Sequence, residues 1–145
     1  MSVEVEVVRE ATDELVEAVA RLLPQLSSRP DPTDRASVTR LLRSDANTLL
    51  TARVRGRVVG MTTLVLVPLP SGLRGRIEDV VVDETARGHG VGSALTEEAL
   101  RLAETAGART VDLTSSPSRQ SANRLYERLG FVARDSRVYR FEVRS

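Results

Sequence analysis

Residues 77–92 read IEDVVVDETARGHGVG, a hydrophobic strand pattern that continues through a short acidic stretch into three closely spaced glycines. The next residues, SALTEEALRLAETAG, have apolar side chains at helical spacing and end at Gly107, a typical C-cap. Glycines let the backbone turn tightly here and expose N–H groups with no Cβ atoms in the way. The start of the helix adds partial positive charge, so the turn is predicted to bind a pyrophosphate, with Arg87 on the same side.

Two common phosphate-binding motifs do not match this turn. A P-loop requires Gly-Lys-Ser/Thr, and the sequence contains no lysine. The dinucleotide pattern G-x-G-x-x-G fails in both registers, because its sixth position is Ser93 from Gly88 and Leu95 from Gly90. A plain tight connection remains an alternative for the turn taken alone, but three glycines and Arg87 at a helix start argue against it.

The composition indicates one ordinary globular domain spanning residues 1–145. Apolar residues make up 41% and charged residues 28%, and the net charge is +1, so no strong field attracts nucleic acid or anionic lipid. Aromatic residues are 3%, too few for a base-stacking surface. The chain has no Cys and one His, which argues against a metal site. An acidic, alternating start and the lack of a long apolar run predict a cytoplasmic protein with no membrane contact.

Periodicity predicts the order βααβββαβαββ, an α/β fold with a mixed central sheet and helices on both faces. Strands are expected at residues 3–7, 48–54, 57–67, 76–82, 110–114, 131–133 and 138–143. Helices are expected after Thr12 to about Pro24, after Thr33 or Asp34 to about Ser44, at 91–106, and from Ser118 to about Leu129. Residues 68–75 are expected to form a turn-rich connection.

Two motifs at the correct mutual spacing resemble the GNAT family of N-acetyltransferases. They are Arg87-x-x-Gly90-x-Gly92 after the valine-rich strand, and ANRLYERLGF at residues 122–131, which is similar to the family's C-terminal helix and following strand. The resemblance implies a single GNAT domain with acetyl-CoA as co-substrate. It also implies direct transfer of the acetyl group to a primary amine, without a covalent enzyme intermediate.

The same resemblance implies a set of residues that bind acetyl-CoA. Val80 and Val82 would pair with the pantetheine arm, and a backbone N–H near Val81 would stabilise the oxyanion. Arg119 occupies a position where many members have Asn, and Asn123 lies one turn further along. His89 is most simply an exposed turn residue. The full expected set is Val80, Val81, Val82, Arg87, Gly88, His89, Gly90, Val91, Gly92, Ser93, Arg119 and Asn123.

Glu78 and Tyr126 are the candidate catalytic residues. An acid on the strand before the glycine turn often acts as the base in the family, and Glu78 is expected to point opposite to Ile77 and Asp79. The alternative is a solvent-facing acid paired with an arginine; Asp79 is the fallback base. Tyr126 matches the family's tyrosine that faces the sulfur of coenzyme A as general acid, and its alternative is a core tyrosine with a satisfied hydroxyl.

The expected acceptor is a small-molecule amine or a protein N-terminus. Its pocket would be built from the first two helices and the loops at residues 29–34 and 69–74. Three serines, Ser115, Ser116 and Ser118, could line the acceptor end, and the alternative is that they only form a loop and cap. The alternative function is a catalytically silent acyl-CoA-binding regulatory module, and a plain nucleotide-binding domain is a third hypothesis. Edge strands such as the last one could support a homodimer.

Overall fold

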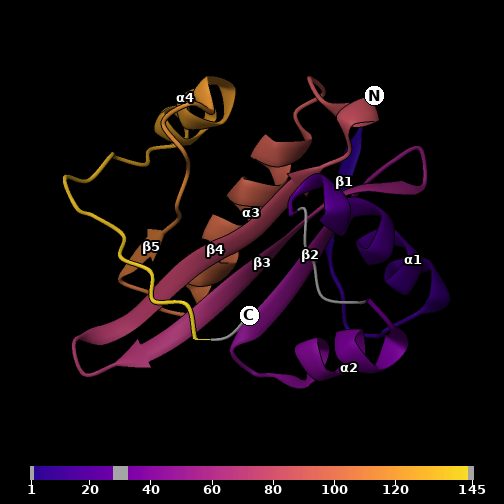
Figure 1. Ribbon diagram of the computed structural model, residues 1–145, viewed down its shortest axis with the longest axis horizontal. Coiled ribbons are helices and arrows are strands. Elements are labelled where there is room, and N and C mark those ends of the chain that lie inside the picture. Colours follow the sequence, from indigo (N-terminus) through magenta and orange to yellow (C-terminus); the bar gives the residue numbers. More distant parts are fainter. Residues whose placement is uncertain (1, 28–32, 144–145) are drawn as a thin grey trace. The chain divides into compact units, whose positions relative to one another are not determined.

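The computed structural model describes residues 2–27 and 33–143 (Figure 1). The chain up to Thr114 and the chain from Ser115 onward are two compact units. The elements are β1 (Val3–Val7), α1 (Asp13–Leu22), the 3₁₀ turn η1 (Leu23–Gln25), α2 (Arg35–Arg43), β2 (Asn47–Val54), β3 (Arg57–Leu69), β4 (Gly72–Val82), the 3₁₀ turn η2 (Glu84–Ala86), α3 (Val91–Thr105), β5 (Thr110–Asp112) and α4 (Gln120–Arg128).

The first unit contains one mixed sheet in the order β1-β2-β3-β4-β5. The first three junctions are antiparallel, and β5 pairs with β4 in parallel after the crossover through α3. This agrees with the predicted α/β class. Helices α1 and α2 lie on one face of the sheet and α3 lies on the other (Figure 1). The long strands β2 and β3 are buried on both faces because helices cover both.

Each face has its own apolar contacts. On the α1 side, a cluster of buried side chains joins the helices to the sheet: Leu15, Ala18, Val19, Leu22, Val38, Leu49, Val58, Met61 and Val81. On the α3 side, a Cβ added to Gly60 would stand 2.8 Å from Val91 Cγ1 and 3.1 Å from Leu95 Cδ1. The missing side chain at Gly60 therefore lets α3 approach the sheet closely.

The predicted starts of α1 and α2 are confirmed by their caps. Thr12 accepts a hydrogen bond from the N–H of Leu15 at 3.2 Å, and Asp34 forms a capping box with Ser37. Gly107 has φ of +87°, the left-handed conformation expected after a helix end.

Three local expectations are wrong. Residues 68–75 form no long connection, because β3 and β4 continue as a hairpin to Leu69 and from Gly72. Helix α4 begins at Gln120 with Arg119 as its N-cap, and Ser118 does not cap it. The strands expected at 131–133 and 138–143 are absent, since residues 131–143 pair with no strand of the described chain. The β-like alternation of these residues lacks a partner within the chain.

The side chains of that C-terminal segment are exposed. Val132, Val138, Tyr139, Phe141 and Val143 are between 73% and 87% accessible to solvent. Separately, among residues 2–27 and 33–143, no helix has the length and apolar character needed to cross a bilayer.

Candidate active site

The glycine turn between β4 and α3 has the backbone geometry expected of a pyrophosphate site. Gly88 and Gly90 adopt φ of +86° and +80°, and a Cβ on either would meet no atom within 4 Å. Gly90 is the N-cap of α3, whose first-turn N–H groups have no acceptor within the helix. The turn therefore presents open space above unpaired donors at the positive end of a 15-residue helix.

The side chains around this turn leave its outer surface free. Arg87 is exposed, and its one hydrogen bond within residues 2–27 and 33–143 runs 3.4 Å from Nε to the carbonyl of Val82, so its terminal nitrogens can reach an anion. His89 is exposed, as expected for a turn residue. Ser93 Oγ donates to Glu97 Oε1 at 3.0 Å, one turn further along α3. The geometry and charge fit a diphosphate group.

Strand β4 enters the turn through a bulge. Its register with β3 runs Gly60 with Val82, Met61 with Val81, and then Thr63 with Glu78. Asp79 has φ of +54°, unusual for a residue with a side chain. Thr62 Oγ1 donates to the carbonyl of Glu78 at 3.0 Å across the irregularity. The bulge breaks the simple alternation that the sequence suggested beyond Glu78.

The edge of β4 opposite β3 is open beside the bulge. Strand β5 pairs only with Arg74, Gly75 and Arg76, and no other strand of the described residues pairs with 77–82 on that side. Val81 is buried against the α1 face, whereas Val80 and Val82 are half-buried. An extended ligand could therefore add to this edge by backbone hydrogen bonds.

Glu78 is half-buried and ion-paired. Its Oε2 atom accepts a hydrogen bond from Arg76 Nε at 2.9 Å, and both side chains remain 40% or more exposed. Ile77 next to it is 2% exposed, so these two side chains do take opposite faces of the sheet. The arginine pairing predicted as the alternative is present, and Glu78 remains accessible beside it.

Asp79 differs electrostatically from an ordinary surface carboxyl. It lies at the surface, yet packed atoms desolvate it, and this desolvation, followed by the neighbouring Glu78 carboxylate, raises its pKa. The carboxyl groups of Glu78 and Asp79 are thus neighbours at the bulge, and the raised pKa makes Asp79 more basic than an ordinary aspartate.

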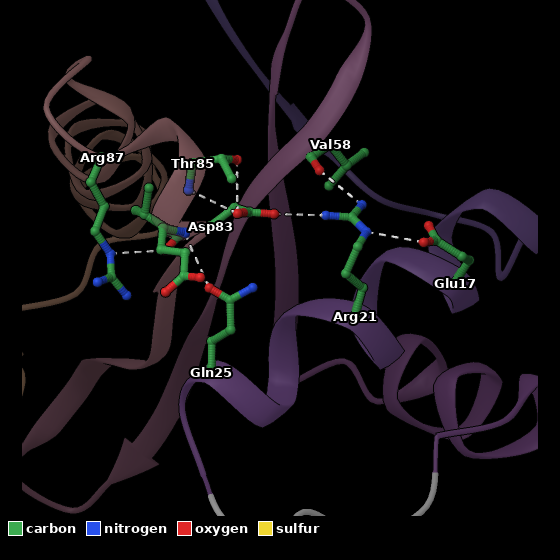
Figure 2. A network of polar contacts seen from close by, with 9 residues as sticks. Glu17, Arg21, Gln25, Val58, Asp83, Thr85 and Arg87 are labelled. Carbon is green, nitrogen blue, oxygen red and sulfur yellow. Dashed lines mark hydrogen bonds and ion pairs between the residues drawn. The ribbon is translucent and has the colours of Figure 1, made fainter.

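Asp83 anchors the end of β4 through contacts that the sequence did not predict (Figure 2). Its Oδ2 atom pairs with Arg21 Nη1 at 3.1 Å, and Oδ1 accepts from the backbone N–H and hydroxyl of Thr85 at 3.0 and 2.9 Å. The Thr85 backbone bond is the largest factor that lowers the Asp83 pKa, helped by the Thr85 hydroxyl and Arg21. Arg21 had no signal in the sequence, because it lies 62 positions from Asp83.

Tyr126 lies in the second unit and has a buried ring. The ring packs edge-to-face on Phe131, with centroids 5.8 Å apart, and burial raises the hydroxyl pKa against the opposing effect of Arg119. Within the described residues the hydroxyl has no hydrogen-bond partner. That differs from the satisfied core tyrosine considered as the alternative.

The other predicted contacts of the second unit are local. Arg119 donates its backbone N–H to Ser116 O at 3.0 Å, and Asn123 Nδ2 donates to the same carbonyl at 3.0 Å. The hydroxyls of Ser116 and Ser118 share a 2.9 Å hydrogen bond, and the enclosed Ser115 Oγ has no hydrogen-bond partner among the described residues. Of the loop expected to help form the acceptor pocket, residues 29–32 lie outside the described residues.

The mixed sheet with helices on both faces and the glycine turn at the start of α3 place this protein in the class of α/β proteins with acetyltransferase architecture. The chain belongs to the Acetyltransferase (GNAT) family, whose sequence model matches residues 12–131. A crystal structure of an acetyltransferase from Trypanosoma brucei is similar at 30% identity and a TM-score of 0.81, over 98% of this chain and 100% of that one.

Two curated relatives match shorter stretches. A glucosamine 6-phosphate N-acetyltransferase from Trypanosoma brucei brucei is 38% identical over 86 residues, 57% of this chain and 56% of the relative. An N-alpha-acetyltransferase 30 from Schizosaccharomyces pombe is 35% identical over 69 residues, 48% of this chain and 45% of the relative. The chain thus aligns with about half the length of these relatives.

Proposed function

We propose that this protein is an acetyl-CoA-dependent N-acetyltransferase that acts as a single domain over residues 1–145. The observation that carries the proposal is the glycine turn with unpaired helix-start donors beside the open edge of β4. Members of the GNAT family use acetyl-CoA, and the turn fits the pyrophosphate of that molecule in charge and space.

Acetyl-CoA would supply an activated thioester, and residues of this chain would bind its separate parts. Arg87, Gly88 and Gly90 would bind the pyrophosphate, together with the backbone of His89 and of the first turn of α3 at Val91, Gly92 and Ser93. The open edge at Val80 and Val82 would pair with the pantetheine arm, and the Val81 N–H would donate to the oxyanion. Arg119 and Asn123 are proposed as further contacts, and no residue is assigned to a metal.

Glu78 is the proposed general base. Its carboxylate is accessible on the bulged strand and would take a proton from the acceptor ammonium, directly or through water, so that the free amine can attack. The pairing with Arg76 holds the carboxylate in one orientation. Asp79 is the alternative base, supported by its raised pKa.

Tyr126 is the proposed general acid. As the new carbon–nitrogen bond forms and the carbon–sulfur bond breaks, the tyrosine hydroxyl would give its proton to the departing sulfur. One observation supports this role: the hydroxyl has no partner within the described chain. Burial raises its pKa, so the hydroxyl carries its proton at neutral pH as an ordinary tyrosine does. The sequence contains no cysteine, in agreement with direct transfer.

The proposed acceptor is a small-molecule primary amine, and a protein N-terminus is the second candidate. The similarity to a glucosamine 6-phosphate N-acetyltransferase favours the small amine. The similarity to an N-alpha-acetyltransferase, which extends over a shorter stretch of the chain, supports a protein N-terminus as acceptor. The contrasting function is a catalytically silent acyl-CoA-binding module.

Calorimetric titration with acetyl-CoA, and with ATP and NAD as controls, tests the co-substrate. Thiol release with glucosamine 6-phosphate and with a short peptide carrying a free N-terminus then tests the transfer. Selective binding with amine-dependent thiol release supports the proposal. Binding without turnover over a wide amine panel would support the silent module, and no binding to a folded sample would contradict both.

Glu78→Gln is expected to lower kcat/KM by about 100-fold, a typical effect of losing a general base, with unchanged acetyl-CoA affinity. The matched control is Glu98→Gln, because Glu98 is also ion-paired, with Oε2 2.6 Å from Arg101 Nη2, but lies on α3. Steady-state kinetics of both variants and of Asp79→Asn make the comparison. Full activity of Glu78→Gln with a large loss in Asp79→Asn would transfer the role to Asp79.

The C-terminal segment is proposed to form a homodimer. Residues 138–143 alternate like a strand, and their apolar side chains are exposed. Antiparallel pairing of two copies about Phe141 would set each Arg140 opposite Glu142 of the other copy. Sedimentation is expected to give about twice the 15.8 kDa of the chain, and Phe141→Glu to give the monomer mass. A monomer mass for the unmodified protein at every concentration would contradict this.

A further inference from the structure

Two side chains from the α1–η1 segment contact the start of the glycine turn (Figure 2). Arg21 pairs with Asp83 at 3.1 Å, and Gln25 Oε1 accepts the backbone N–H of Glu84 at 3.1 Å. They are four residues apart, so they project toward the same side of the segment. Their targets, Asp83 and Glu84, are the first two residues after β4, and they precede the turn that binds the pyrophosphate in the proposed function.

Arg21 is held in place by contacts on three of its nitrogens. Nε donates to Glu17 at 3.0 Å, Nη2 donates to the carbonyl of Val58 at 3.0 Å, and Nη1 donates to Asp83. The Arg21 side chain is 21% exposed and the Asp83 side chain 8%. A planar guanidinium fixed in this way can set the position of its carboxylate partner.

Asp83 is hydrogen-bonded both to β3 before it in the chain and to η2 after it, so its position affects the backbone on both sides. Its N–H donates to Val59 O at 2.7 Å, which fixes the end of β4 against β3. Its carbonyl accepts the N–H of Ala86 at 2.8 Å, and its carboxylate caps η2 through Thr85. Ala86 is buried, and the next residue is Arg87. A change at Asp83 would therefore displace the donors of the turn.

We propose that Arg21 is a positioning residue for binding of the acetyl-CoA pyrophosphate: through Asp83 it fixes the glycine turn in the orientation that accepts the diphosphate. The inference rests on the proposed function and extends it to a side chain on α1 that has no contact with the turn's own glycines. Gln25 has the same role in weaker form, because it contributes one neutral hydrogen bond.

The test compares two acetyl donors that differ in the pyrophosphate. Acetyl-CoA carries it, whereas S-acetylpantetheine ends before it and relies on the β4 edge. Arg21→Gln is expected to lower kcat/KM for acetyl-CoA about tenfold, since a misplacement of about 1 Å can cost about a hundredfold and a smaller displacement costs less. The value for S-acetylpantetheine should stay within twofold of the unmodified enzyme. Arg21→Lys should recover part of the loss, and Gln25→Ala should give a smaller loss, about threefold.

Arg53→Gln is the matched control, because Arg53 on β2 also joins α1 to the sheet, through Glu14 at 2.7 Å, and it pairs in addition with Glu6 on β1 at 2.9 Å. This variant should leave the ratio of kcat/KM for acetyl-CoA to kcat/KM for S-acetylpantetheine unchanged. The inference would be overturned if Arg21→Gln and Gln25→Ala lowered kcat/KM equally for both donors. It would also be overturned if neither variant lowered kcat/KM for acetyl-CoA. An unmodified enzyme that turns over neither donor would instead contradict the proposed function.

Discussion

Replacing Gly90 with glutamate is expected to abolish acetyl-CoA binding while leaving the protein folded. Gly90 has φ of +80° and no atom within 4 Å of an added Cβ, so the new side chain meets backbone strain but no steric clash. The strain costs about 1–3 kcal/mol. The carboxylate would stand where the proposed function puts the diphosphate, and like charges about 4 Å apart repel by about 4 kcal/mol at an effective dielectric of 20. That energy corresponds to about a thousandfold loss of affinity.

Gly56→Glu separates this charge effect from the strain. Gly56 lies in the β2–β3 turn with φ of +79°, and a Cβ there also meets nothing within 4 Å. Thermal unfolding should show similar destabilisation for both variants, whereas calorimetry should show lost acetyl-CoA binding only for Gly90→Glu. Normal affinity in folded Gly90→Glu would refute the pyrophosphate site.

Replacing Tyr126 with phenylalanine is expected to lower kcat by about two orders of magnitude or more, the usual contribution of a general acid. Acetyl-CoA affinity should be nearly unchanged, because only the hydroxyl is removed and the ring contact with Phe131 remains. Since burial raises the pKa of Tyr126, the unmodified enzyme should keep its acid form through neutral pH. Its kcat should fall only when the pH rises through that raised pKa.

Tyr139→Phe is the control, because Tyr139 is the second of the two tyrosines and is 87% exposed. Its turnover and its pH profile should match those of the unmodified enzyme. The alkaline decrease in kcat should disappear in Tyr126→Phe. Unchanged turnover in Tyr126→Phe would remove this residue from the acid role.

Local patterns predicted most of the first unit. The alternation of Val3–Val7, the caps at Thr12 and Asp34 and the glycine turn involve residues close together in the chain, so their conformations follow from local sterics and hydrogen bonds. The prediction of strands at residues 131–133 and 138–143 was wrong for a related reason. Alternation marks a segment that is able to pair, but pairing requires a partner strand that the pattern cannot identify.

The sequence by itself determined the α/β class, the family and the glycine turn with Arg87, because these depend on short motifs and on periodicity. Only the tertiary structure decided the surroundings of the candidate residues. Glu78 acquires Arg76 as its partner, and Asp79 acquires a raised pKa from its place in the bulge. Arg21 joins Asp83 across 62 positions of sequence. Such contacts depend on how helices pack on the sheet, and that packing brings together side chains whose separation in the chain carries no signal.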